Sequence, residues 1–332
     1  MIQICSGPEK QHTVKLQEGA SGILMMLKRP APDTMNIIEI QNLSKYYRRS
    51  RGIEDITLNV RQGDIFGFIG PNGAGKSTTI RILLNLIFPT SGTARIFGMD
   101  AVRDSRAIRG RIGFVPSDAN LYDRMKVTEF LHYSAAFYTR DDRSDRINEL
   151  AKILELDIER KIHELSSGNK KKVSIIQSLI HHPELLILDE PTVGLDPLIQ
   201  SRFFNLLREE NGSGTTIFFS SHVLSEVQAL CKTVGIVRNG KIIKVEEIAT
   251  LRKKQLKKIT AVFPEETDLK SLGIRGIESA ELTSGRTLIF LFSGDINDLI
   301  GIISGMQIEN LIIEEPPLEE IFLHFYADHK EQ

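Results

Sequence analysis

The sequence has little cysteine. Its two cysteines, Cys5 and Cys231, lie far apart and belong to no CxxC or Cys/His cluster. Disulfide frameworks and structural zinc sites are built from closely grouped cysteines, so the sequence predicts neither of them. Two isolated thiols fit a reducing compartment best.

Long apolar runs are also missing. Stretches such as Thr287 to Phe292 are far shorter than the ~20 residues that a membrane-spanning helix requires. The segment from Gly22 to Leu27 is too short for the apolar part of a secretory signal, and no small-residue cleavage site follows it. If the protein serves a membrane, we expect it to act through a partner.

An excess of positive charge is absent as well. The formal net charge is −1, whereas domains that coat nucleic acid are usually strongly basic. We therefore expect no nucleic-acid partner. The length of 332 residues suffices for about two domains at ~150 residues each, and neither would need a disulfide or a metal to be stable.

The pattern of apolar residues divides the chain into three parts. We interpret residues 1–34 as a disordered extension, with a functional arm as the alternative. From residue 36 to about 250, short β-rich runs alternate with helical ones, which predicts an α/β domain with a largely parallel sheet. Ile65 to Phe68 is an expected strand, and Asn239-Gly240 predicts a type I′ hairpin. Ile80, Leu83, Leu84 and Ile87 predict one face of a buried helix.

A second, smaller domain is expected at residues 258–327. The basic stretch from Arg252 to Lys258 marks the boundary, as a solvated linker or, alternatively, as a patch for lipid headgroups. Three strands are expected, and a closing helix should begin near Pro317 and end near Phe325. This order of elements predicts a small α+β domain. The expected strands are Ile259–Phe263, Thr287–Phe292 and Asn310–Glu314.

The sequence between Gly70 and Ser77 fits the phosphate-loop pattern G-x-x-x-x-G-K-[ST], after a predicted strand and before a predicted helix. Glycines let backbone N–H groups approach phosphate oxygens closely, and a helix N-terminus favours anions. We expect Lys76 to reach the β- and γ-phosphates of ATP and the Ser77 hydroxyl to bind Mg²⁺. The residues expected around the phosphates are Gly70, Pro71, Asn72, Gly73, Ala74, Gly75, Lys76, Ser77 and Thr78.

A predicted buried strand, Leu185 to Leu188, is followed by two carboxylates. Asp189 is placed to hold Mg²⁺ through a water molecule, and Glu190 to activate the attacking water as a general base. An apolar strand that ends in Asp-Glu is often only an exposed strand end. Together with the phosphate loop, however, this pair predicts ATP hydrolysis.

With these motifs the chain resembles the ATP-binding-cassette (ABC) ATPases. The specific match is Leu165-Ser-Ser-Gly-Asn169, which occupies the position of the LSGGQ signature shortly before the carboxylate strand. Gly194-Leu-Asp-Pro197, with Asp196, resembles the D-loop of the family, and Ser220-Ser-His222 resembles its switch histidine. The resemblance covers about residues 36–250. It implies a P-loop NTPase with a RecA-like core, an antiparallel β subdomain and a helical subdomain.

The resemblance also implies a mechanism. Two copies of the chain, or one copy and a paralogue, would sandwich two ATP molecules head to tail. Ser166, Ser167 and Gly168 of one copy would contact the γ-phosphate that Lys76 of the other copy binds, and His222 would hold the attacking water. ATP, whose γ-phosphate would contact both copies, would bind the closed dimer far better than ADP can. This difference in affinity is how a ligand drives a conformational change.

Tyr47, in the sequence LSKYY, corresponds to the aromatic residue that stacks on adenine in this family, and Tyr46 is the alternative. Two positions depart from the family pattern. Ser117 stands where a glutamine usually contacts Mg²⁺ and the attacking water, so a contact with the metal would pass through a water molecule. Ser167 and Asn169 replace a glycine and the glutamine of the signature, which leaves open slow hydrolysis or two unequal sites.

The resemblance points to transport. The segment from Ser117 to Phe130 resembles the part that docks the coupling helix of a permease, with Leu121 and Tyr122 as expected exposed contacts and simple loop packing as the alternative. The C-terminal sequence PPLEEIFLHFY resembles the tail of bacterial export ATPases with a single cassette. This tail favours export over import.

We therefore predict the ATPase motor subunit of a bacterial ABC exporter, held at the cytoplasmic face of the cell membrane by a separate permease. The alternative is a soluble ABC ATPase that acts on ribosomes or DNA. Ribosomal types generally carry two cassettes, and DNA-repair types carry long coiled coils. This chain has one phosphate loop and no sustained heptads. Since contacts with the cargo lie in the permease, the sequence does not identify the cargo.

Overall fold

The computed structural model describes residues 35–48, 50–119, 121–138, 143–253, 257–265, 276–282 and 285–314. The extension expected at residues 1–34 and the closing helix expected between Pro317 and Phe325 lie outside the described residues. Within the described part, no helix is both long and apolar enough to cross a membrane.

A six-stranded sheet forms the centre of the larger domain, with strand order β10-β9-β3-β8-β7-β6. All neighbouring strands are parallel except β9 and β10, which form the hairpin expected at Asn239-Gly240. Both hairpin residues have positive φ, 48° and 77°, as a type I′ turn requires. The strands are β3 (Ile65–Ile69), β6 (Ile112–Val115), β7 (Leu185–Asp189), β8 (Thr216–Ser221), β9 (Thr233–Arg238) and β10 (Lys241–Glu247).

A second, antiparallel sheet has strand order β2-β1-β4-β5. Its strands are β1 (Asn36–Tyr47), β2 (Ser50–Arg61), β4 (Ser91–Ile96) and β5 (Met99–Asp100). From Ile56 to Arg61 in β2, buried residues alternate with exposed ones, because this strand turns one face to the core and the other to solvent. Strand β1 has register shifts, and buried residues such as Ile37 and Ile38 follow each other in it.

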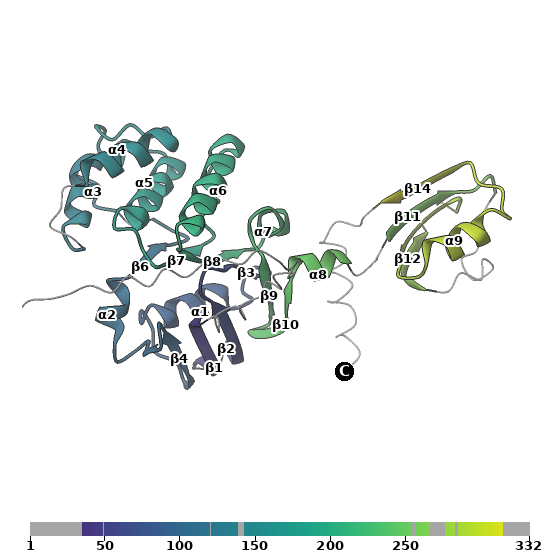
Figure 1. The fold of residues 1–332 in the computed structure, drawn as a ribbon, viewed down its shortest axis with the longest axis horizontal. Coiled ribbons are helices and arrows are strands. Elements are labelled where there is room, and N and C mark those ends of the chain that lie inside the picture. The colour runs from purple at the N-terminus through teal and green to yellow at the C-terminus, as the bar shows by residue number, and fades with distance from the viewer. Residues whose placement is uncertain are drawn as a thin grey trace, which may run out of the picture. The chain divides into compact units, whose positions relative to one another are not determined.

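The helices lie on both sides of the parallel sheet. Figure 1 shows α3 to α6 gathered on one side, and α1 with the antiparallel sheet on the other. The helices of this part are α1 (Lys76–Leu83), α2 (Ser105–Arg109), α3 (Val127–Ala135), α4 (Ser144–Ile153), α5 (Ser167–Leu179), α6 (Pro197–Gly212), α7 (Leu224–Leu230) and α8 (Ile248–Lys253), with a 3₁₀ turn at Ile162–Glu164.

Strand β7 shows why the central strands read as continuous apolar runs. Leu186 and Leu188 pack into the core on the helical side, and Leu185 and Ile187 into the core shared with the antiparallel sheet. All four side chains are fully buried, and each contributes about 1.5–3 kcal/mol of hydrophobic stabilisation. A strand that is buried on both faces is therefore apolar at every position.

The helix after the phosphate loop is shorter than its apolar pattern predicts. Ile80, Leu83 and Leu84 are buried as expected, but α1 ends at Leu83. Asn85 has a φ of 51°, and a left-handed residue ends a helix. Ile87 therefore packs against the core from the chain that follows the helix.

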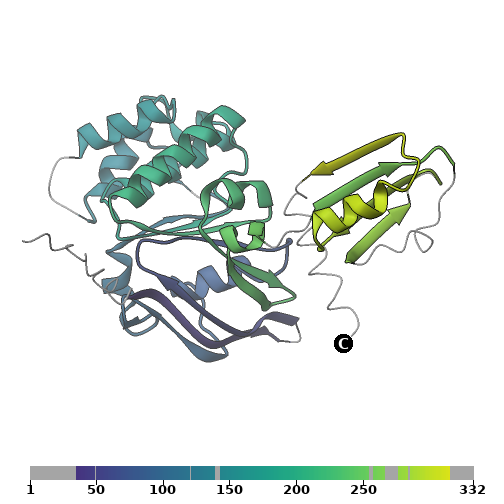
Figure 2. The ribbon, with the colours of Figure 1, turned by 45° about the vertical axis from the view of Figure 1, so that its right-hand side comes forward.

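The described residues of the C-terminal part form an antiparallel sheet with order β12-β13-β11-β14 and a helix, α9 (Ile296–Ile303). The strands are β11 (Lys257–Val262), β12 (Ile277–Leu282), β13 (Thr287–Phe292) and β14 (Asn310–Glu314). Figure 2 shows α9 against one face of this sheet, where Leu299 joins Ile259 and Phe290 in a separate small core. The domain boundary near residue 258 stays a prediction, as does its end near residue 327.

Candidate functional site

The predicted site residues come together where parallel strands end. β6, β7, β8 and β3 are adjacent and parallel, so their carboxyl ends form one edge of the sheet, the edge at which such sheets bind ligands. Gly70 follows β3, Asp189 ends β7, His222 follows β8, and Ser117 follows β6 after one proline. Residues more than 100 positions apart in the sequence, such as Ser77 and Asp189, therefore touch.

The phosphate loop needs its glycines for backbone geometry. Gly73 and Gly75 have φ values of 80° and 107°, which residues with a Cβ rarely adopt. A Cβ on Gly70 would lie 2.2 Å from the carbonyl oxygen of Val237. Helix α1 begins directly after the loop at Lys76, so its first backbone N–H groups are free to bind an anion.

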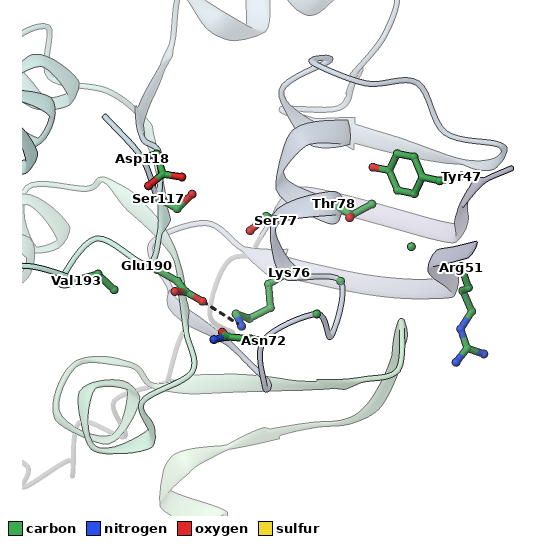
Figure 3. A pocket seen from close by; sticks show the side chains of 13 residues that line it. Tyr47, Arg51, Asn72, Lys76, Ser77, Thr78, Ser117, Asp118, Glu190 and Val193 are labelled. Carbon is green, nitrogen blue, oxygen red and sulfur yellow. Dashed lines mark ion pairs between the residues drawn. The ribbon is translucent and has the colours of Figure 1, made fainter. Parts of the chain in front are cut away.

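Lys76 is the buried cation of the site, with 4% of its surface exposed. Its Nζ donates to the carbonyl oxygens of Gly70 (2.7 Å) and Pro71 (3.2 Å). The same Nζ lies 3.2 Å from Oε1 of Glu190 (Figure 3). The other carboxylate oxygen of Glu190 lies 3.3 Å from Nδ1 of His222. The expected base thus connects the lysine that is expected to bind phosphate with the expected switch histidine.

Asp189 is buried and held by two hydroxyl groups. Its Oδ1 accepts hydrogen bonds from Ser220 Oγ (2.8 Å) and Ser77 Oγ (3.2 Å). Ser220 Oγ also accepts from the backbone N–H of Glu190. The sequence analysis named Ser220 only as part of the switch-histidine motif and gave it no role, although it is the polar residue that faces Asp189 in the register of β7 and β8.

The oxygen atoms around Asp189 fit a magnesium ion. One carboxylate and one serine hydroxyl lie in contact, and the described residues include no group of three or more His, Cys, Asp or Glu side chains that could hold a metal by themselves. Mg²⁺ is typically held by one or two carboxylates, water and substrate phosphates, whereas a dedicated cage of side chains is typical of other metals. The donors present are therefore of the kind that binds Mg²⁺ together with a nucleotide.

One cavity of about 560 Å³ contains most of the predicted nucleotide contacts (Figure 3). Arg51, Gly52, Asp118 and Val193 line it too and were not among the predicted contacts. Gly70, Pro71, Ala74, Asp189 and His222 do not line it themselves. The lining residues are Tyr47, Arg51, Gly52, Asn72, Gly73, Gly75, Lys76, Ser77, Thr78, Ser117, Asp118, Glu190 and Val193.

The lining of the cavity distinguishes the two candidate aromatic residues. Tyr46 and Tyr47 are equally exposed, at 42%, but Tyr47 lines the cavity. The hydroxyl of Tyr46 donates to Oε1 of Glu54 (3.2 Å). Gly52 leaves room for the Tyr47 ring, because a Cβ at that position would lie 2.8 Å from Tyr47 Cε2. The geometry favours Tyr47 as the stacking residue.

The signature and the D-loop contact each other away from this cavity. Ser166 caps α5 by accepting a hydrogen bond from the N–H of Asn169 (3.3 Å), and Asp196 caps α6 by accepting from Ile199 (3.0 Å). A Cβ on Gly168 would lie 2.4 Å from the carbonyl oxygen of Gly194. Ser166, Ser167 and Gly168 do not line the cavity.

An aromatic patch begins in the segment expected to contact a permease, Ser117 to Phe130, and continues beyond it along the chain. Tyr122, on the chain before α3, is 60% exposed, and Tyr133 and Phe137 are exposed as well. Their rings pack edge to face in sequence, with centroids 6.1 Å and 5.1 Å apart. Leu121 was expected to be exposed, but it is partly buried because it packs against the helical core.

Comparisons with known proteins agree on one family. The model of the family described as "ABC transporter" matches residues 53–193. The bacitracin transport ATP-binding protein BcrA of Bacillus licheniformis is 39% identical over 227 residues, which cover 67% of this chain and 73% of that protein. The uncharacterized ABC transporter ATP-binding protein YhaQ of Bacillus subtilis is 31% identical over 295 residues, or 86% and 97% of the two chains.

Solved structures extend this agreement to the fold. An ATP-binding subunit of an ABC transporter aligns with a TM-score of 0.62 at 29% identity, over 65% of this chain and 92% of the other. A dimeric ATP-binding cassette in a post-hydrolysis state, bound to ADP and Pi, aligns with a TM-score of 0.60 at 25% identity, over 64% and 98%.

Proposed function

The chain belongs to the family of ABC transporter ATP-binding proteins and is an ATP-hydrolysing subunit. We propose that two copies close head to tail over two ATP molecules and drive export through a separate permease. The predicted fold class, a P-loop NTPase of the ABC type, is confirmed by the structural matches. The alternative of a soluble protein acting on ribosomes or DNA is not favoured, since the relatives are transport proteins.

The main support for the head-to-tail arrangement is the placement of the two halves of the site. Lys76, Ser77 and Glu190 line one cavity, whereas the signature Ser166–Gly168 lies outside it at the start of α5. In the proposed arrangement, a γ-phosphate bound at Lys76 would meet the signature of the second copy. ATP then stabilises the closed dimer and ADP does not, which gives the nucleotide the differential affinity that a switch requires.

The chain's own residues would carry the hydrolytic step. Tyr47 would stack on the base, the loop from Gly70 to Ser77 would hold the phosphates, and Lys76 would neutralise the β- and γ-phosphates. When bound, Mg²⁺ would lie near Ser77 and Asp189 and neutralise developing charge on the phosphate oxygens.

Glu190 would act as the general base. A γ-phosphate would draw Lys76 away from Glu190, and the freed carboxylate could then accept the proton of the attacking water. The new bond joins the water oxygen to the γ-phosphorus, and the bond from this phosphorus to the ADP oxygen breaks. His222, already 3.3 Å from Glu190, would orient the base and the water.

The permease would bind the aromatic patch of Tyr122, Tyr133 and Phe137. Exposed aromatic side chains are enriched at the centres of protein interfaces, and Tyr122 lies in the segment after Ser117 that was expected to contact a permease. Binding to a permease would hold the protein at the cytoplasmic face of the membrane. BcrA is named for bacitracin transport and another relative for Nod factor export, and we propose export for this chain without naming a cargo.

Mixing two defective variants tests the head-to-tail arrangement. Lys76→Met removes the phosphate contact, and Ser166→Asp keeps a residue that caps α5 but places a negative charge against the γ-phosphate. Each variant alone should hydrolyse little ATP. A mixed dimer would contain one site with both parts intact, so mixing should restore activity. Inactivity in a mixed dimer whose formation is demonstrated by differential tags would refute the arrangement.

Glu190→Gln tests the chemistry independently. This variant should retain ATP binding, lose ~10²–10⁴-fold in turnover as expected for a lost general base, and elute as a dimer with ATP. Near-normal hydrolysis would remove Glu190 from the role of base.

A further inference from the structure

Lys171 is a lysine buried in the helix that begins with the signature. It lies in the second turn of α5 (Ser167–Leu179) and is 4% exposed. Its Nζ donates to two consecutive carbonyl oxygens, those of Pro116 (2.9 Å) and Ser117 (2.5 Å). A buried ammonium must be paired with acceptors to offset its lost hydration, and here both acceptors belong to a turn of the nucleotide site.

This turn connects the core with the cavity. Pro116 and Ser117 follow β6, whose last residue, Val115, pairs with Leu188, the neighbour of Asp189. Ser117 and Asp118 line the cavity. The hydrogen bonds of Lys171 therefore fix the backbone of the cavity wall to the helix that carries the signature.

The charge of Lys171 also faces the site. Burial lowers the pKa of Lys171, and the carboxylates of Asp118, Asp189 and Glu190 oppose that shift. These three carboxylates flank the position where the γ-phosphate would react. The ammonium thus lies within electrostatic range of the reacting centre without lining the cavity.

The two neighbouring lysines have different surroundings. Lys170 pairs with Asp123 at the surface. Lys172 is about as buried as Lys171, at 8% exposed, but its Nζ reaches only the carbonyl oxygen of Glu155, at 3.5 Å. Burial of a lysine on α5 is therefore not sufficient for a tie to the site, and Lys172 is a natural control.

We propose that Lys171 is a positioning residue for ATP hydrolysis, which holds the Pro116–Ser117 backbone so that Ser117 and Asp118 face the reacting phosphate. The tie matters here because the Ser117 side chain is short, so its position depends on its backbone. Since α5 starts with the signature, the tie also links the nucleotide site of one copy to the signature that it offers to the other. The inference rests on the proposed function.

Lys171→Met is the decisive variant, with Lys172→Met as its matched control. Lys171→Met leaves Lys76 and Tyr47 untouched, so ATP should still bind, while kcat should fall roughly ten- to a hundredfold through misplacement of the turn. Lys172→Met should keep the kcat of the wild type. ATP affinity is measured by calorimetry in EDTA, and kcat by steady-state phosphate release.

A wild-type kcat for Lys171→Met, an equal loss in Lys172→Met, or a loss of ATP affinity that accounts for the whole effect would overturn the proposal. If Lys171→Met does not fold, the same comparison is made with Lys171→Gln. Its neutral amide ends one bond nearer the backbone than Nζ, so it should lose at least one of the two hydrogen bonds and lower kcat, and a wild-type kcat again overturns the proposal. Wild-type protein without ATPase activity would instead contradict the proposed function. If the wild-type protein is active and the Lys171→Met variant is equally active, this inference is refuted while the proposed function still stands.

Discussion

The contact between Lys76 and Glu190 predicts that ATP affinity rises when the base is neutralised. A γ-phosphate and Glu190 compete for the same ammonium, which lies 3.2 Å from the carboxylate. Glu190→Gln keeps the shape and a hydrogen-bond acceptor but removes the competing charge. It also removes the repulsion between this carboxylate and the phosphate. We therefore expect this variant to bind ATP more tightly than the wild type.

The distance gives the size of the effect. Two unit charges 3.2 Å apart attract by about 5 kcal/mol at an effective dielectric constant of ~20. Desolvation of Lys76, which is nearly buried, offsets part of this attraction, and hydrogen bonds to charged groups typically retain about 1.5–3 kcal/mol. If ATP recovers about half of that net value, or ~0.75–1.5 kcal/mol, its affinity should increase roughly three- to twelvefold, because ~1.4 kcal/mol corresponds to a factor of ten.

Calorimetric titration with ATP in EDTA measures this affinity without turnover. ADP has no γ-phosphate, so its affinity should change much less. The matched control is Glu184→Gln, which removes a carboxylate paired with Arg111 outside the cavity. Titrations at several protein concentrations separate the charge effect from dimer formation, which depends on concentration. Unchanged or weaker ATP binding, or an equal gain for ADP, would refute the reasoning.

Four further predictions follow from the same structure. Tyr47→Ala should weaken ATP and GTP binding alike by ~1–3 kcal/mol, since stacking tolerates any base; stronger effects from Tyr46→Ala in filter binding would show that the wrong ring was chosen. Ser117→Gln should preserve or raise hydrolysis, and a large loss of phosphate release would assign Ser117 a specific role. Truncation after Thr250 should leave ATP binding measurable but weaken assembly in sedimentation; a folded truncation that cannot bind ATP would contradict this. Burial lowers the pKa of His181 from 6.5 to about 4, so folding favours its neutral form. The free energy of unfolding should therefore fall as the pH drops from 6.5 to about 4. In denaturant titrations, His181→Phe should lose this part of the pH dependence.

Local motifs made most of the nucleotide site predictable. The phosphate loop fits a pattern in consecutive residues because one loop and one helix N-terminus surround the phosphates. Asp189 and Glu190 could be recognised because they end an apolar strand that is buried on both faces. Neither prediction required knowledge of the tertiary structure. The contact between the phosphate-loop residue Ser77 and Asp189 follows from the general rule that adjacent parallel strands end at the same edge of a sheet.

Residues whose roles depend on tertiary packing could not be recognised from the sequence alone. Ser220 became recognisable only when β8 was placed beside β7, which sets its hydroxyl 2.8 Å from Asp189. Lys171 reads as one of three consecutive lysines, and only the approach of α5 to the end of β6 distinguishes it. Arg51 lines the cavity because β2 passes close to the phosphate loop. Each of these roles depends on which helices, strands and loops are neighbours in the fold.

Two elements of the C-terminal part were missed for different reasons. Strand β12, with the sequence IESAEL, contains too few apolar residues to show alternation, so its pairing with β13 could not be expected. Helix α9 carried a readable signal: Asp295 caps it, and Ile296, Leu299, Ile300 and Ile303 follow helical spacing. Gly301 within this segment lowers the helix propensity, which obscured that signal.

The cavity draws one wall from the antiparallel sheet and the others from helix α1 and the loops that follow the parallel strands, and this matters for inhibitor design. The wall that would hold the phosphates follows a sequence pattern shared by P-loop proteins in general, so compounds that mimic triphosphate have little basis for selectivity. Tyr47, Arg51 and Gly52 belong to the antiparallel sheet and follow no such general pattern. A selective compound should therefore stack on Tyr47 and offer an acceptor to Arg51, with only a light anchor at the phosphate loop.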